Sequence, residues 1–263
     1  MLTKSFSQSY NLIHTLAMND FRSKHARSAF GLLWLFLTPL GMLLVYWGVF
    51  SYTLDITWSN QDGVNIGYVL PFFIGYSLFL VFSEVVTSSL NLFISKKNYV
   101  KKSPISLWLL WFANLYRCYL QGGIYLIIIF LIALIQQKIS FIGVTFFVVF
   151  LFGSIIFISA ISLFLSALGP FLNDLSEASR VVLRIMFYSA PVTYPLSLVP
   201  ENMRYILWFN PLTNIIEPIR NALLFSQFPQ VITYSKFIVI SIILIFVCVW
   251  FFNRAEDAIV DVV

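Results

Sequence analysis

Long apolar stretches alternate with short polar segments along most of the chain. Six of them approach or exceed the roughly 20 residues that a helix needs to cross a bilayer core of about 30 Å. They lack the strict alternation of a barrel strand, so we expect α-helices with internally bonded backbones. The predicted spans are Phe30–Tyr52, Ile66–Ile94, Ile105–Ile135, Phe141–Leu168, Ser179–Leu196 and Ile232–Phe252. The pattern therefore predicts an all-α integral membrane protein with six transmembrane helices.

The residues before the first span predict an amphipathic helix in the membrane interface. Leu12, Ile13, Leu16, Ala17 and Phe21 recur at helical spacing on one side, with polar residues elsewhere. We assign residues 1–29 to this interface helix and residues 30–263 to the transmembrane domain. Docking of a partner and simple attachment to the membrane surface both fit the pattern.

The segment between the fifth and sixth spans is apolar but cannot be one helix. Five prolines interrupt it: Pro191, Pro195, Pro200, Pro211 and Pro218. Proline removes a backbone donor and disfavours helix at the residue before it. Short helices at Glu201–Trp208 and Leu212–Leu224 would fit a re-entrant hairpin, at about residues 195–228, that dips in from the outer face.

Composition supports a membrane protein. Of 263 residues, 60% are hydrophobic, 18% aromatic and 10% charged, and the mean hydropathy is +0.89, which excludes an ordinary soluble surface. The net charge of +5 comes from short basic clusters beside apolar stretches, so we expect no nucleic-acid partner. Cys118 and Cys248 lie inside apolar segments and predict no disulfide.

The distribution of charge predicts the topology. With six spans, most cations fall on one face: Arg22, Lys24, Arg27, Lys96, Lys97, Lys101, Lys102, Arg180, Arg184 and Arg254. The other face carries a weaker and mixed set: Asp55, Asp62, Lys138, Glu201, Arg204, Glu217, Arg220 and Lys236. Lysine and arginine in short loops mark the cytoplasmic side, so we expect both termini in the cytoplasm.

Two opposite charges, Glu84 and Arg117, lie near the middle of the second and third predicted spans. Glu84 lies twelve positions before Lys96, and Arg117 lies twelve positions after Ile105, so folding the chain between them brings both to a similar depth. An unpaired charge near the bilayer centre costs about 2.5 kcal/mol or more. We expect the two to pair; the alternative is that each faces the translocation path separately.

Motifs for catalysis are missing. The sequence has no G-x-x-x-x-G-K-[ST] phosphate loop, H-E-x-x-H, CxxC or G-x-S-x-G. Asp174 with Glu177, and Glu256 with Asp257, would be the acids of a membrane-embedded enzyme for lipid-phosphate sugars, but solvated loop charges explain them more simply. We expect no enzyme activity, no metal and no cofactor on this chain.

Several short motifs follow one another along nearly the whole chain. They are S-x-x-G-x-x-W-x-x-x-x-P at Ser28–Pro39, Lys102-Ser103-Pro104, N-D-L at Asn173–Leu175, S-A-P-V-T-Y-P at Ser189–Pro195, N-P-L-T-N-I-I-E-P-I-R at Asn210–Arg220 and F-N-R-A-E-D at Phe252–Asp257. In this order and topology the chain resembles the permease subunit of a type-2 ABC exporter for cell-surface polysaccharide. It departs from the family at Asn173, where such permeases usually carry arginine.

The resemblance implies a homodimer of permeases in the inner membrane on two copies of a cytoplasmic ABC ATPase, which would bind ATP and Mg. The expected substrate is an undecaprenyl-type lipid-linked glycan, most simply O-antigen. Capsule or teichoic-acid exporters, and exporters of drugs or other lipids, are the alternatives.

The resemblance also implies two coupling helices, at residues 10–27 and 96–103, that fit clefts of the ATPase. The expected contact residues are Asp20, Arg22, Lys24, Arg27, Lys97, Asn98, Tyr99 and Lys101. For the basic loop, membrane topology and contact with anionic lipid are the alternative.

Aromatic side chains of the first and fifth spans are candidates for the path of the glycan. An aromatic face packs against a sugar C–H face without a fixed hydrogen-bond pattern, which suits a sliding polymer. The candidates are Trp34, Tyr46, Trp47, Phe50, Phe187, Tyr188 and Tyr194. The candidates in the re-entrant segment are Pro191, Pro195, Asn210, Pro211, Glu217 and Arg220.

Overall fold

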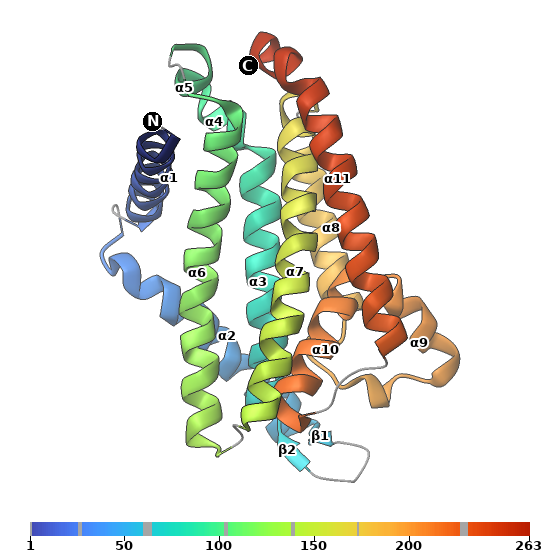
Figure 1. The fold of residues 1–263 in the computed structure, drawn as a ribbon. Helices are drawn as coiled ribbons and strands as arrows, with labels where there is room; N and C mark the ends of the chain where they lie inside the picture. The colour runs from blue at the N-terminus through green and yellow to red at the C-terminus, as the bar shows by residue number, and fades with distance from the viewer. Residues whose placement is uncertain are drawn as a thin grey trace.

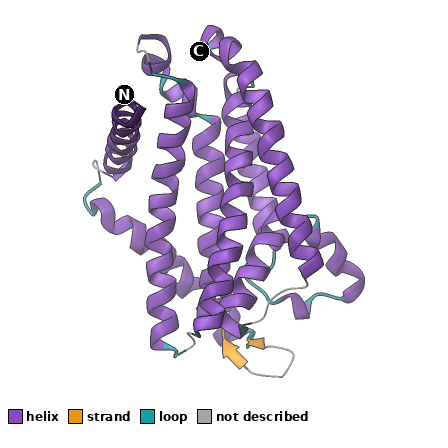
Figure 2. Ribbon diagram, in the orientation of Figure 1, coloured by secondary structure: helices purple, strands orange, loops and turns teal. Residues whose placement is uncertain are grey.

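The computed structural model describes residues 2–25, 28–59, 65–102, 105–137, 140–172, 174–226 and 231–263, and nearly all of its regular structure is helical (Figures 1 and 2). The α-helices are α1 (Leu2–His25), α2 (Trp34–Tyr46), α3 (Val69–Leu90), α4 (Leu92–Ser95), α5 (Lys97–Lys102), α6 (Leu107–Ile135), α7 (Phe141–Leu168), α8 (Leu175–Ser189), α9 (Glu201–Trp208), α10 (Pro211–Phe225) and α11 (Val231–Val262). The other helical turns are η1 (Gly31–Leu33), η2 (Trp47–Thr53), η3 (Gly169–Phe171) and η4 (Leu196–Leu198). A short antiparallel ribbon of β1 (Trp58–Ser59) and β2 (Asn65–Gly67) departs from the all-α prediction.

Five helical stretches in the described part of the chain are long and apolar enough to cross a membrane. They are Gly31–Thr53, Val69–Leu90, Leu107–Ile135, Phe141–Phe171 and Tyr234–Val262. These confirm five of the six predicted spans.

The predicted fifth span, Ser179–Leu196, is not one helix. α8 ends at Ser189, and turns follow as far as Pro195. The reason is Pro191, which lacks the N–H that would continue the helix and disfavours helical backbone at Ala190. With 15 residues, α8 is about 22 Å long, shorter than a bilayer core of about 30 Å.

α3 lies at the centre of the helix bundle. It packs against α6, α7, α8 and α10, and α11 packs along the far side of α7 (Figure 1). Every residue from Leu70 to Leu78 is buried. By contrast, α2 buries only the stripe of Leu35, Pro39 and Leu43, which leaves most of its apolar surface exposed.

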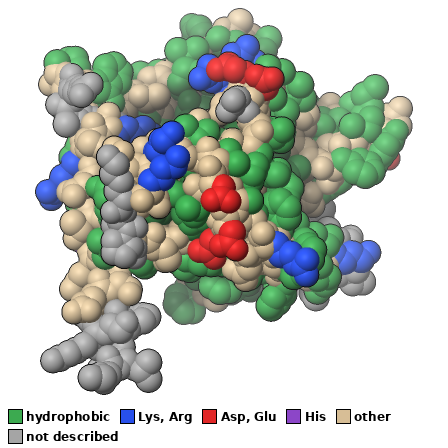
Figure 3. All heavy atoms as spheres, turned by 90° about the horizontal axis from the view of Figure 1, so that it is seen from above, with side chains coloured by type: hydrophobic (Ala, Val, Ile, Leu, Met, Phe, Trp, Pro, Cys, Tyr) green, Lys and Arg blue, Asp and Glu red, His purple; other side chains and the backbone are tan. Residues whose placement is uncertain are grey.

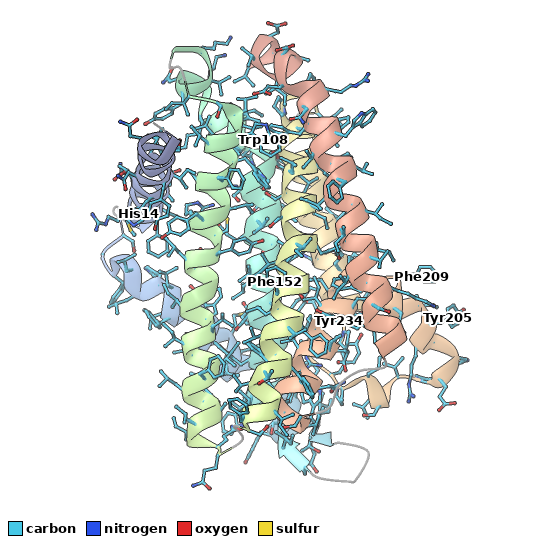
Figure 4. All side chains as sticks on the ribbon, in the orientation of Figure 1. His14, Trp108, Phe152, Tyr205, Phe209 and Tyr234 are labelled. Atoms are coloured by element: carbon cyan, nitrogen blue, oxygen red, sulfur yellow. The ribbon has the colours of Figure 1, made fainter. Side chains whose placement is uncertain are left out.

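The interface helix α1 lies along α6 through the predicted apolar face. Leu16 is 7% exposed and Ala17 is fully buried. His14, on the same side of α1, places its ring 5.9 Å from the ring of Tyr116 in α6 (Figure 4). The amphipathic pattern is thus satisfied by another helix of the same chain.

Both termini and α5 lie at one end of the molecule, and the β1–β2 ribbon lies at the other (Figure 1). Figure 3 looks onto the end with the termini and shows Lys and Arg side chains at several places, with Asp and Glu side chains between them. The predicted grouping of the termini and the basic loop on one side agrees with this arrangement.

The two short helices predicted after the fifth span are present as α9 and α10. The Asn210 side chain caps α10 by accepting a hydrogen bond from the Leu212 N–H at 3.0 Å, and Pro211 occupies the first helical position. α10 is largely buried against α7 and α3, whereas α9 buries none of its residues. Tyr205 and Phe209 lie on the outer side of this segment (Figure 4).

The predicted placement of Glu217 and Arg220 was wrong. We expected both among the polar residues of the outer face, but they are 8% and 0% exposed. Arg220 Nη1 lies 2.7 Å from Glu217 Oε1, and its other nitrogens donate to the carbonyl oxygens of Pro191 at 2.8 Å and Pro71 at 3.1 Å. The guanidinium also lies 5.1 Å from the ring centre of Trp58. Arg220 therefore joins α10 to α3, to β1 and to the turn after α8.

Candidate functional site

A groove of about 400 Å³ opens between α2, α3 and α8. Its lining residues are Met42, Tyr46, Tyr76, Phe79, Arg180, Leu183, Arg184, Phe187 and Tyr188. We call it the aromatic groove. Within the described chain, the residues that line it include two arginines and no acidic residue. The groove thus offers flat apolar rings beside positive charge.

Phe187 lies at the centre of the rings of the aromatic groove. Its ring centre is 4.7 Å from that of Phe79 and 5.2 Å from that of Tyr188. The rings of Tyr46 and Tyr76 both lie 6.2 Å away, edge to face. These distances are typical of favourable aromatic contacts. Phe187 is 7% exposed and Tyr188 is 62% exposed, so Tyr188 presents its ring to an occupant of the groove.

A column of rings continues from the groove along α3. Tyr68, Phe72 and Tyr76 recur every four residues, so they share one face, and neighbouring rings stack with centres 5.4 Å apart. Phe50 and Tyr46 of the first span pack beside this column. The column is buried and leads from the groove toward the β1–β2 end.

The structure brings together only part of the predicted translocation path. Tyr46, Phe50 and Phe187 meet through the rings described above. Tyr188 contacts Phe187, and Tyr194 donates from its hydroxyl to the Tyr188 carbonyl oxygen at 3.2 Å.

Trp34 and Trp47 do not line the groove. Trp34 donates to the hydroxyl of Ser28 at 2.7 Å, about three turns away from Tyr46 along the first span. Trp47 directly follows Tyr46 and is 44% exposed. Neighbouring residues of a helix point about 100° apart, so Trp47 cannot point into the groove together with Tyr46.

Sequence reasoning missed four aromatic or charged residues of the groove, together with the apolar Met42 and Leu183. Tyr76 and Phe79 come from the second predicted span, and Arg180 and Arg184 were assigned to membrane topology. The available signal was the spacing of Arg180, Arg184 and Tyr188, which stand four residues apart on one helix.

A second cluster, which we call the charge network, contains Asp20, Lys24, Glu84, Lys96 and Arg117. Glu84 Oε1 lies 2.8 Å from Arg117 Nη1, and its Oε2 lies 2.7 Å from Lys24 Nζ. Lys96 Nζ also bonds to Asp20 Oδ1. The network connects α1 with α3, α6 and the start of α5.

The expected contact of Glu84 with Arg117 is confirmed, and Lys24 is a third member that the sequence analysis did not anticipate. The Arg117 side chain is 8% exposed and also donates to Asn114 Oδ1 at 3.2 Å. A buried guanidinium needs a counter-ion and hydrogen-bond acceptors to offset its lost hydration.

The other predicted coupling residues lie on exposed surface. Lys97, Asn98, Tyr99 and Lys101 are exposed on α5, while Val100 between them is buried. Arg22 on α1 is exposed, and Arg27 lies outside the described residues. Their contact with an ATPase stays a prediction.

Comparison with known proteins finds a matching family model and several relatives. The family model for the ABC-2 type transporter matches residues 11–224. A protein from Klebsiella pneumoniae named O-antigen export system permease protein RfbA is 23% identical over 237 residues, which are 87% of this chain and 88% of that protein. The polysialic acid transport protein KpsM from Escherichia coli is 21% identical over 256 residues, which are 94% of each chain.

Proposed function

Because the chain belongs to the ABC-2 type transporter family, we propose that it is the transmembrane subunit of an ATP-driven exporter of lipid-linked polysaccharide. Members of this family are multi-pass membrane permeases that pair with an ATPase subunit, so the chain is a transport subunit and not an enzyme.

The aromatic groove is the observation that carries the proposal. Phe79, Phe187 and Tyr188 form connected ring faces beside Arg180 and Arg184. Rings bind the C–H faces of sugars through contact area and not through fixed hydrogen bonds, so successive units of a polymer can move past them. This distinguishes the groove from a closed pocket built for one small molecule.

The charge network and α5 could transmit motion of the ATPase subunit to the helices that line the groove. α1 and the start of α5 are joined through Asp20 and Lys96, and α1 is joined to α3 and α6 through Glu84. A rigid-body shift of an ATPase bound at α1 and α5 would therefore move α3, which lines the groove. ATP and Mg would bind to that separate subunit.

For topology we propose six crossings in the inner membrane, with both termini cytoplasmic. α8 would supply the inner part of the fifth crossing, and α9 and α10 a re-entrant hairpin from the outer side. The charge pattern and the position of both termini at one end support this. We propose a homodimer on two ATPase copies as the assembly.

The relatives favour a glycan substrate. O-antigen is the first candidate because two relatives named for O-antigen export match most of the chain. A capsular glycan is the second, because the relative named for polysialic acid transport matches 94% of the chain.

Deletion of the gene in its host tests the proposal. We expect loss of one surface polysaccharide and accumulation of its lipid-linked form inside the cell, both restored by the wild-type gene. Phe187→Ala should restore less than wild type because it removes the central ring, whereas Phe246→Ala, an exposed ring on α11, should restore fully. Unchanged surface polysaccharide in the deletion strain would refute the proposal.

A further inference from the structure

Arg184 is a cation that stands beside exposed apolar residues on α8. It lies at the middle of α8, nine residues from Leu175, which is about 13 Å along the helix axis. Within the described part of the chain it has no hydrogen-bond or ion-pair partner. Its neighbours on α8 include Val181 and Ile185, which are 61% and 62% exposed. An arginine at membrane depth is costly and marks a site where a partner or water meets it.

Arg180 lies one turn from Arg184 on the same side of α8, and both line the aromatic groove. Its ion pair is with Glu177, three residues away, with both side chains about 70% exposed. Such an exposed pair contributes little and exchanges readily for another anion. Two arginine side chains therefore line one groove with weak internal compensation.

Arg184 also borders a second hollow. This hollow, of about 520 Å³, is lined by Val181, Arg184, Ile185, Tyr188 and Ser189. Arg184 and Tyr188 thus line both the aromatic groove and a hollow with apolar walls. A molecule lying across them would place a ring-stacking part on one side, an anion at the arginines and an apolar part on the other.

We infer that Arg184, assisted by Arg180, binds the phosphate that joins glycan to lipid in the exported substrate; this rests on the proposed function. Guanidinium matches phosphate oxygens with paired donors and stays charged at all relevant pH values. The aromatic groove offers rings beside two arginines, and the adjoining hollow adds the apolar side chains of Val181 and Ile185, so the two together suit the sugar, phosphate and lipid parts of one molecule. An ordinary phospholipid has the phosphate and the apolar chains but no glycan to fill the ring side.

Binding to the full chain in phosphatidylcholine nanodiscs tests the inference. The probe is a radiolabelled hexose joined to undecaprenol through a phosphate, with neutral undecaprenol and phosphatidylglycerol as competitors. Arg184→Gln should weaken binding of the probe about tenfold or more, because a hydrogen bond to a charged group is lost. Arg184→Lys should keep part of the affinity, and Arg180→Gln should have a smaller effect than Arg184→Gln.

Arg254→Gln is the matched control. Arg254 stacks on Trp250 of the same helix, α11, 5.1 Å from its ring centre, and does not line the groove. It should bind the probe like wild type. Equal melting temperatures would show that the variants fold; if Arg184→Gln fails to fold, the weakened binding of Arg184→Lys carries the test.

Two results would overturn the inference: wild-type binding by Arg184→Gln or, where that variant does not fold, by Arg184→Lys; or displacement of the probe by phosphatidylglycerol at equal concentration, which would make the site one for any lipid phosphate. The assay does not depend on export. Lost probe binding with intact surface polysaccharide in the deletion strain would reject the proposed function alone, whereas unchanged binding with a clear deletion defect would reject the phosphate site alone.

Discussion

Glu84 shows how one carboxylate can serve two helices. It pairs with Arg117, whose side chain is 8% exposed, and with Lys24, whose side chain is 41% exposed. The two pairs should therefore differ in importance. Losing the partner of a buried ion leaves a charge with neither water nor counter-ion, whereas an exposed cation remains hydrated.

Single substitutions in the charge network should lower the free energy of unfolding by different amounts. Glu84→Gln and Arg117→Gln should each lower the free energy of unfolding by about 3–5 kcal/mol, and Lys24→Gln by about 1 kcal/mol or less. Thermal unfolding in detergent measures the order. Lys24→Gln as damaging as Glu84→Gln would contradict it.

The double exchange Glu84→Arg with Arg117→Glu examines the same contact. It restores the α3–α6 pair but sets a second cation beside Lys24, so only part of the lost stability should return. Adding Lys24→Glu should return more, because position 24 then again faces an opposite charge. No gain from either combination would argue against direct pairing.

Gly75 leaves the space that Arg220 occupies. A Cβ at position 75 would lie 2.6 Å from Arg220 Nη2 and 3.3 Å from Ile216. Arg220 is fully buried and bonded to three separate partners, so it has little room to retreat. The sequence alone did not reveal this, because the residues that surround Arg220 come from four separate segments.

Gly75→Ala should therefore destabilise the protein by about 1–3 kcal/mol, the range for overpacked cores. Gly123→Ala in α6 is the control, since a Cβ there meets nothing within 4 Å and alanine favours helix by about 1 kcal/mol. Melting temperatures should fall for the first and stay or rise for the second. A stable Gly75→Ala variant with Arg220 contacts intact would disprove the packing argument.

Among the elements, the long helices were predictable and their interruptions were predictable only in part. Hydrophobic runs fixed five spans, and prolines located α9 and the start of α10 to within a residue. The break at Asn91 between α3 and α4 and the β1–β2 ribbon were not anticipated. Each of them contacts a segment far away in the sequence: Asn91 accepts a hydrogen bond from Ser176 at 3.1 Å, and Trp58 of the ribbon lies against Arg220.

The short helix α5 should contact the ATPase subunit. Cysteine at Asn98 or Lys101, both exposed, should crosslink to the ATPase in the purified complex. Cysteine at Ser197, exposed in η4 after α8, is the control and should not crosslink. Efficient crosslinking at position 197 and none on α5 would reverse the proposed orientation.

At the scale of the whole molecule, the sequence predicted the class of protein better than its site. Apolar runs and basic loops are visible in the local composition. The membrane fold and the position of both termini on one side could therefore be predicted from the sequence. The aromatic groove needs α2, α3 and α8 to meet, and no local pattern encodes that meeting. Hence Phe187 and Tyr188 were anticipated, whereas Phe79 and the position of Arg184 in the lining of the groove were not.

The most direct test of polysaccharide export is transport by the permease with its ATPase subunit in sealed vesicles, with lipid-linked glycan on the nucleotide side. We predict that ATP makes the glycan accessible to a membrane-impermeant glycosidase on the opposite side. Phe187→Ala should slow this step while ATP turnover continues, and the permease alone should hydrolyse no ATP. ATP turnover with the glycan remaining inaccessible would contradict the account.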